Sequence, residues 1–145
     1  FNLIYTVIST PAGALSDRIG RRKIIIGGWV AYALIYLGFG FAQAAWHIWV
    51  LYALYGLYYG LAYGTAKALV ADLVPAALRG TAYGTYNAIL GILDFPASAI
   101  AGILWQGLGG WQGFGASAPF IFGGVLALLA ALLLGLSGIG RTRVG

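Results

Sequence analysis

Two long stretches of this chain carry no Asp, Glu, Lys or Arg, and they constrain the fold more than any other feature. They cover residues 24–66 and 95–140. Each is long enough for two membrane crossings, because one helix needs about 20 residues to span a hydrocarbon core of roughly 30 Å. A hydrophobic content of 61% and a mean hydropathy of +0.90 agree with this. The sequence therefore predicts a membrane protein and excludes a soluble enzyme, a nucleic-acid-binding domain and a disulfide-stapled secreted domain.

Hydropathy and helix-breaking residues divide the chain into five apolar segments. The first is short: it begins at Phe1, ends near Pro11 and Gly13, and is expected to be the tail of a helix that starts outside the sequence. All five should be helices, because lipid offers no water to unpaired backbone groups. The predicted fold class is therefore an all-α polytopic membrane protein with about five transmembrane segments, the first truncated. The four complete spans are predicted at about 24–43, 47–73, 80–105 and 118–136.

The connectors between these segments alternate between basic and uncharged. Residues 16–23, 72–80 and 140–145 contain Lys or Arg, whereas the connectors near residues 43–47 and 106–117 contain neither. Basic residues favour the cytoplasmic side of a membrane. We expect the charged connectors and the C-terminus to be cytoplasmic, in a bacterial plasma (inner) membrane.

One basic connector has a more specific pattern. GALSDRIGRRK, residues 13–23, resembles the loop signature of the major facilitator superfamily (MFS) of secondary transporters, and ADLVPAALRGTAYGTYNAILG from residue 71 is similar to a later loop and helix of bacterial members. The resemblance implies an MFS-like helical bundle, with this chain as the end of the C-terminal half. The alternative is that the basic cluster only sets membrane orientation. The matching residues are Gly13, Leu15, Asp17, Arg18, Gly20, Arg21 and Arg22.

Charged residues near this loop are candidates for a cytoplasmic gate. Arg79 is a predicted partner for Asp17 or Asp72, and such a pair would hold this face in one state; the alternative is a solvated pair worth about 0–1 kcal/mol. Lys67 lies about 9 Å from the predicted end of its span. We expect it to reach the interface or Asp72 by extending its side chain, with a gate ion pair as the alternative.

Tyrosines share one face of the third span. Glycines spaced by four residues, from Gly56 to Gly64, run beside them and permit close helix approach. The tyrosines either border a substrate cavity or fill space against neighbouring helices. Their spacing keeps them within roughly 60° of one another. They are Tyr52, Tyr55, Tyr59 and Tyr63.

The fourth span contains one acidic residue, Asp94, which is predicted to lie near the bilayer midplane. An ionisable group at that depth is a candidate functional site. Tyr83, Asn87 and Ser98 fall on the same helical face, and Pro96 invites a kink. We expect this stripe to bind substrate or to couple transport to an ion. The alternative is a protonated Asp94 that hydrogen-bonds to a facing helix.

The predicted function is secondary active transport of a small molecule by alternating access, with the missing N-terminal half of the same transporter as partner and protons as a candidate coupling ion. The alternatives are a helical membrane assembly or structural module without transport activity, and an intramembrane enzyme. An enzyme is disfavoured because the chain lacks a second midplane carboxylate, a His pair and a cysteine. We expect no cofactor and no metal site, because His47 is the lone histidine and has no Asp or Glu near it in sequence.

Overall fold

The computed structural model describes residues 2–137, which fold into helices, so the all-α prediction is confirmed. Within that range the extended structure is limited to a single bridge between Leu108 and Trp111. The basic C-terminal segment, including Arg141 and Arg143, lies outside the described residues, as does Phe1. The elements are α1 (Asn2–Ile19), α2 (Arg21–Gly40), α3 (Ala45–Asp72), the 3₁₀ helix η1 (Ala76–Leu78), α4 (Arg79–Gln106) and α5 (Ser117–Leu136).

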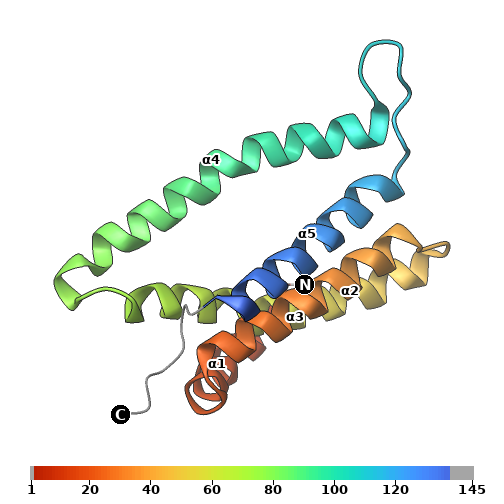
Figure 1. The fold of residues 1–145 in the computed structure, drawn as a ribbon. Coiled ribbons are helices and arrows are strands. Elements are labelled where there is room, and N and C mark those ends of the chain that lie inside the picture. The colour runs from red at the N-terminus through yellow and green to blue at the C-terminus, as the bar shows by residue number, and fades with distance from the viewer. Residues whose placement is uncertain (1, 138–145) are drawn as a thin grey trace.

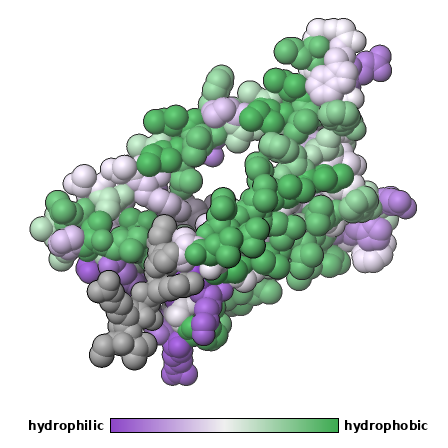
Figure 2. Space-filling view, in the orientation of Figure 1, coloured by the Kyte–Doolittle hydropathy of each residue, from purple (hydrophilic) through white to green (hydrophobic). Residues whose placement is uncertain are grey.

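Four helices pack against one another and the fifth stands apart. α3 contacts both α1 and α2, and α2 contacts α5, which gives the order α1, α3, α2, α5. α4 runs at a distance from these helices along most of its length and joins them near its ends (Figure 1). None of its residues is buried. Hydrophobic side chains cover α4 as well as the packed helices, and hydrophilic ones gather near the helix ends (Figure 2).

Three helical segments in the described part of the chain are long and apolar enough to cross a membrane: Arg21–Gly40, Ala76–Gln106 and Ser117–Leu136. α3 has 28 residues and is also long enough. It falls outside this group because its tyrosines and glycines lower its mean hydropathy. The tyrosines of α3 are Tyr52, Tyr55, Tyr58, Tyr59 and Tyr63.

The first helix is longer than the sequence predicted. α1 continues past Pro11 and Gly13 and ends at Ile19. A proline inside a helix removes one backbone hydrogen bond and its ring crowds the preceding turn, but membrane helices tolerate it because neighbouring groups satisfy the freed carbonyl. The chain leaves the helix at Gly20, whose φ of 98° lies in the left-handed region that favours glycine. The expected connector at 16–23 is therefore reduced to one residue between two helices.

The turn between α2 and α3 is held by His47, a role that the sequence analysis did not assign. Its Nδ1 accepts hydrogen bonds from the backbone N–H groups of Gln43 at 3.2 Å and Ala44 at 3.3 Å. Backbone donors at the start of a helix have no partner within the helix. The imidazole thus satisfies two donors just before α3 begins.

α2 and α3 approach closely at Gly28. A Cβ atom added to Gly28 would lie 2.6 Å from the Cβ of Ala62, which is itself buried. The neighbouring Gly27 has nothing within 4 Å of the same added atom. Small residues at such positions let the backbones of membrane helices pack tightly. The contact between these two helices therefore depends on the absence of a side chain at Gly28.

We predict that Gly28→Ala lowers the free energy of unfolding by about 1–3 kcal/mol, because one added methyl overfills the contact with Ala62. Gly27→Ala is the matched control and should be neutral or stabilising, since alanine favours helix over glycine. Adding Ala62→Gly to Gly28→Ala should restore part of the loss. Chemical or thermal unfolding in detergent measures this, and equal stability of the Gly27 and Gly28 variants would contradict it.

Candidate functional site

Arg21 links three helices at the charged end of the structure. Its Nε lies 2.9 Å from Asp72 Oδ2, and its Nη2 lies 3.3 Å from Asp17 Oδ1. Asp17 is in the last turn of α1 and Asp72 is the last residue of α3. The side chain of Arg21 is 27% exposed, that of Asp17 65% and that of Asp72 49%. Water therefore screens both pairs, and each is worth about 0–1 kcal/mol.

Arg22, the next residue, reaches the end of α5. Its Nη2 donates to the backbone carbonyls of Leu134 at 2.7 Å, Gly135 at 2.8 Å and Ser137 at 2.6 Å. The last carbonyls of a helix have no partner within the helix and carry partial negative charge. A guanidinium group supplies both the missing hydrogen-bond donors and a compensating positive charge. Arg22 therefore fastens α2 to α5, while its Nε is buried without a hydrogen-bond partner among the described residues.

The expected pairing of Arg79 with Asp17 or Asp72 is wrong. Arg21 takes both carboxylates, and Arg79 Nε instead donates to the carbonyl of Ala71 at 3.3 Å. The reason is geometric: the one-residue turn at Gly20 brings Arg21 directly beside α1, whereas Arg79 follows η1 and is exposed.

Three other predicted gate or signature residues, Arg18, Gly13 and Lys67, lie outside the link formed by Arg21. Arg18 is exposed in the last turn of α1, and Gly13 lies inside that helix. Lys67 Nζ lies 4.8 Å from the centroid of the Tyr63 ring, an arrangement that attracts a cation to the ring face. Asp72, the partner considered for Lys67, pairs with Arg21.

Three of the four tyrosines in the predicted stripe form a continuous series of ring contacts, called here the tyrosine ladder, whereas the fourth, Tyr52, contacts Phe39 of α2 at 5.4 Å. Ring centroids lie 4.7 Å apart from Tyr63 to Tyr59, 5.9 Å from Tyr59 to Tyr55 and 6.1 Å from Tyr55 to Tyr36. Tyr36 then contacts Phe120 of α5 at 5.8 Å. The ladder thus runs along α3 and crosses α2 to α5. Such aromatic pairs add about 0.5–1.5 kcal/mol beyond the burial of their surface.

Part of the ladder comes from α2, whose tyrosines were not among the predicted site residues. Tyr32 and Tyr36 stack at 4.0 Å, and Tyr32 contacts Tyr58 of α3 at 5.2 Å. Spacing of four residues on α2 could have indicated that Tyr32 and Tyr36 share a face. It could not have indicated that this face meets α3. Tyr32 and Tyr36 therefore pack between α2 and α3.

The polar stripe of α4 has a different environment. Asp94, Asn87 and Ser98 are exposed, and Tyr83 is half-buried. Asp94 makes no hydrogen bond through its carboxylate and no ion pair with any residue from 2 to 137. α4 continues through Pro96 to Gln106. The four residues share a helix face, as predicted, but that face lies on the helix that stands apart from the packed four.

These features define a polytopic helical membrane protein with a compact charged turn at one end. Residues 1–143 match the model of the Major Facilitator Superfamily, so the chain belongs to that family, as the signature predicted. It is 37% identical over 134 residues to an uncharacterized MFS-type transporter of Methanocaldococcus jannaschii, covering 92% of this chain and 32% of that protein. The chain thus spans about a third of the length of this relative. No solved structure matches it.

Proposed function

We propose that this chain is part of a secondary active transporter that moves a small molecule across the plasma membrane by alternating access, together with an N-terminal half. The observation that carries the proposal is the link from Arg21 to Asp17 and Asp72, which joins α1, α2 and α3 at one end. Membership of the major facilitator superfamily supports it. In such transporters, helical units rock against one another around a site near the middle of the membrane.

The strength of this link suits a gate. A buried ion pair would be costly to break, whereas a partly solvated pair worth about 0–1 kcal/mol can open and close repeatedly. Arg18, Lys23 and Arg79 lie near the same end of the structure as the link. Since basic residues favour the cytoplasm, we assign this end and the C-terminus to the cytoplasmic side. The link then acts as a cytoplasmic gate.

We propose further that the stripe of α4 binds substrate or carries the coupling proton. An exposed carboxylate in an apolar span is costly against lipid, so Asp94 needs cover from another part of the protein or from a water-filled cavity. α4 has no buried residue in the described chain, which leaves that face available. Tyr55, Tyr59 and Tyr63 of α3 are the proposed second wall of the route, with hydroxyl groups and ring edges as contacts. On α4, the stripe consists of Asp94 together with Tyr83, Asn87 and Ser98.

The gate predicts a specific kinetic result. Asp17→Asn should slow the turnover of the complete transporter severalfold without changing its amount in the membrane, because it weakens a link that forms in only one state. Asp17→Glu keeps the charge and is the matched control, with turnover closer to that of the parent. Rates of substrate exchange in proteoliposomes measure this. Unchanged turnover in Asp17→Asn would leave the residue as a determinant of orientation only, and the absence of any transport by the parent would favour a structural module or an enzyme.

The stripe predicts a separate result for Asp94→Asn. If Asp94 exchanges a proton, the variant should lose gradient-driven accumulation but keep downhill exchange, because asparagine preserves the hydrogen-bonding shape. If Asp94 binds a cationic substrate, affinity should fall at every pH and exchange should fail as well. Ile92→Ala, an exposed position of α4 outside the stripe, controls for general damage to that helix. Parent-like affinity, exchange and accumulation in Asp94→Asn would contradict both roles.

A further inference from the structure

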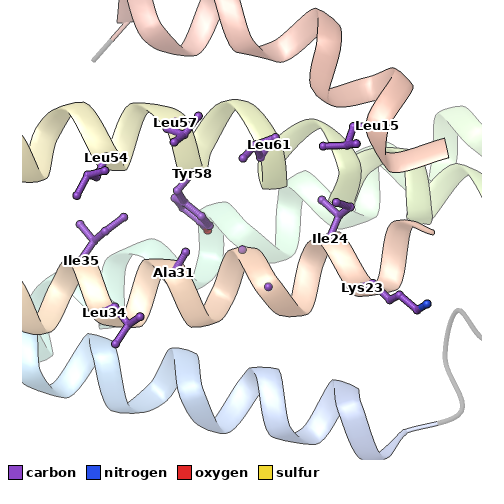
Figure 3. Close-up of a pocket in the computed structure, with 12 residues that line it drawn as sticks. Leu15, Lys23, Ile24, Ala31, Leu34, Ile35, Leu54, Leu57, Tyr58 and Leu61 are labelled. Atoms are coloured by element: carbon purple, nitrogen blue, oxygen red, sulfur yellow. The ribbon is translucent and has the colours of Figure 1, made fainter. Parts of the chain in front are cut away.

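Two hollows in the surface meet at Lys23. The first, the apolar groove, has a volume of about 410 Å³ and lies between α1, α2 and α3 (Figure 3). Its walls are aliphatic side chains and glycines, apart from Tyr58 and from Lys23 at one end. Its lining includes Lys23, Gly27 and Ile35 of α2, and Leu54 and Leu61 of α3.

The second hollow, the charged cavity, has a volume of about 890 Å³ and lies where α1, α2, α3 and α5 end or begin. Lys23 lines both hollows. On α1, Leu15 lines the groove and the next residue, Ser16, lines the cavity. An apolar hollow and a charged hollow therefore adjoin one another, an arrangement that matches an amphipathic ligand.

The charged cavity has an excess of positive charge. Arg21 forms ion pairs with both Asp17 and Asp72, so its charge is compensated by these two carboxylates. Arg22 bonds to neutral carbonyls of α5 and keeps its own charge. Lys23 is exposed and makes no ion pair within residues 2–137. The cavity therefore favours an anion beside Lys23, and the buried Nε of Arg22 is a further donor without a partner there.

The length of the groove matches one leaflet of a bilayer. The groove follows α2 from Lys23 to Ile35, a rise of about 18 Å at 1.5 Å per residue. Half of a hydrocarbon core of roughly 30 Å is about 15 Å. Gly27 keeps the groove open, because nothing lies within 4 Å of a Cβ placed there. One acyl chain fits between the level of the headgroups and the middle of the membrane.

We propose that an anionic phospholipid of the cytoplasmic leaflet binds to this surface. One acyl chain lies in the apolar groove and the phosphate lies beside Lys23 in the charged cavity. Basic residues at the cytoplasmic face attract anionic lipids, and aliphatic walls accept the chain. The assignment to this leaflet rests on the orientation given under Proposed function, but lipid binding does not require transport.

Native mass spectrometry of the complete transporter tests the proposal, with phosphatidylglycerol and phosphatidylcholine of identical chains as probes. Lys23→Gln should reduce retention of phosphatidylglycerol about fivefold, the factor expected for one lysine at an anionic surface, and leave phosphatidylcholine unchanged. Gly27→Leu should reduce retention of both lipids by filling the groove. The matched controls are Lys67→Gln and Gly102→Leu, the latter at another glycine with open space around it, and both should behave as the parent.

A second measurement needs no variant. Phosphatidylglycerol with a diazirine in its acyl chain should label the segment from Leu54 to Leu61 more than the exposed Leu132 and Leu133 of α5. Equal retention of the two lipids, labelling spread evenly over the helices, or displacement of the lipid by inorganic phosphate alone would overturn the proposal. These readouts are independent of transport, so an inactive transporter that still binds the lipid would contradict only the proposed function.

Discussion

The left-handed turn at Gly20 is the constraint on which the charged end of the structure depends. With one residue between α1 and α2, it places Arg21 and Arg22 side by side at the start of a helix. Arg21 reaches Asp17 and Asp72, and Arg22 reaches the end of α5. Two adjacent guanidinium groups therefore bring four helices to one point. A residue with a Cβ atom would strain this backbone conformation, which explains the glycine.

The two arginines have different energetic roles. Arg22 Nη2 lies within hydrogen-bonding distance of three carbonyls at a helix terminus, which share its two hydrogens, and a hydrogen bond that involves a charged group contributes about 1.5–3 kcal/mol. Arg21 makes partly solvated ion pairs that contribute little to stability. We assign Arg22 a lasting structural role, and the proposed function makes Arg21 the link that opens during transport. Under that proposal, stability and switching belong to two neighbouring residues.

The sequence predicted the helices and the family because both follow from local patterns. Hydropathy located α2 to α5, and the spacing of Asp17, Gly20 and Arg21 indicated the superfamily. It could not predict that Arg21 would replace Arg79 as the partner of Asp72, because that depends on where three helices end in space.

The tyrosine ladder likewise includes a contact between helices that the sequence could not predict. Periodicity placed Tyr55, Tyr59 and Tyr63 on one face, but it could not predict that Tyr36 of α2 would meet them. For α4 the helical face of Asp94 was predictable, whereas its separation from the packed helices was not. Contacts between helices depend on both partners, and a single helix pattern describes only one of them.

Hydrogen exchange of the complete protein in detergent tests the division of roles between the two arginines most directly. Arg22→Gln should speed exchange in the last turn of α5 by about tenfold or more and leave the end of α3 unchanged, because it frees carbonyls that fix that turn. Arg21→Gln should speed exchange at the end of α3 by less than about fivefold and leave α5 unchanged. Parent-like exchange in both variants, or the same change at both helix ends in each variant, would contradict the account.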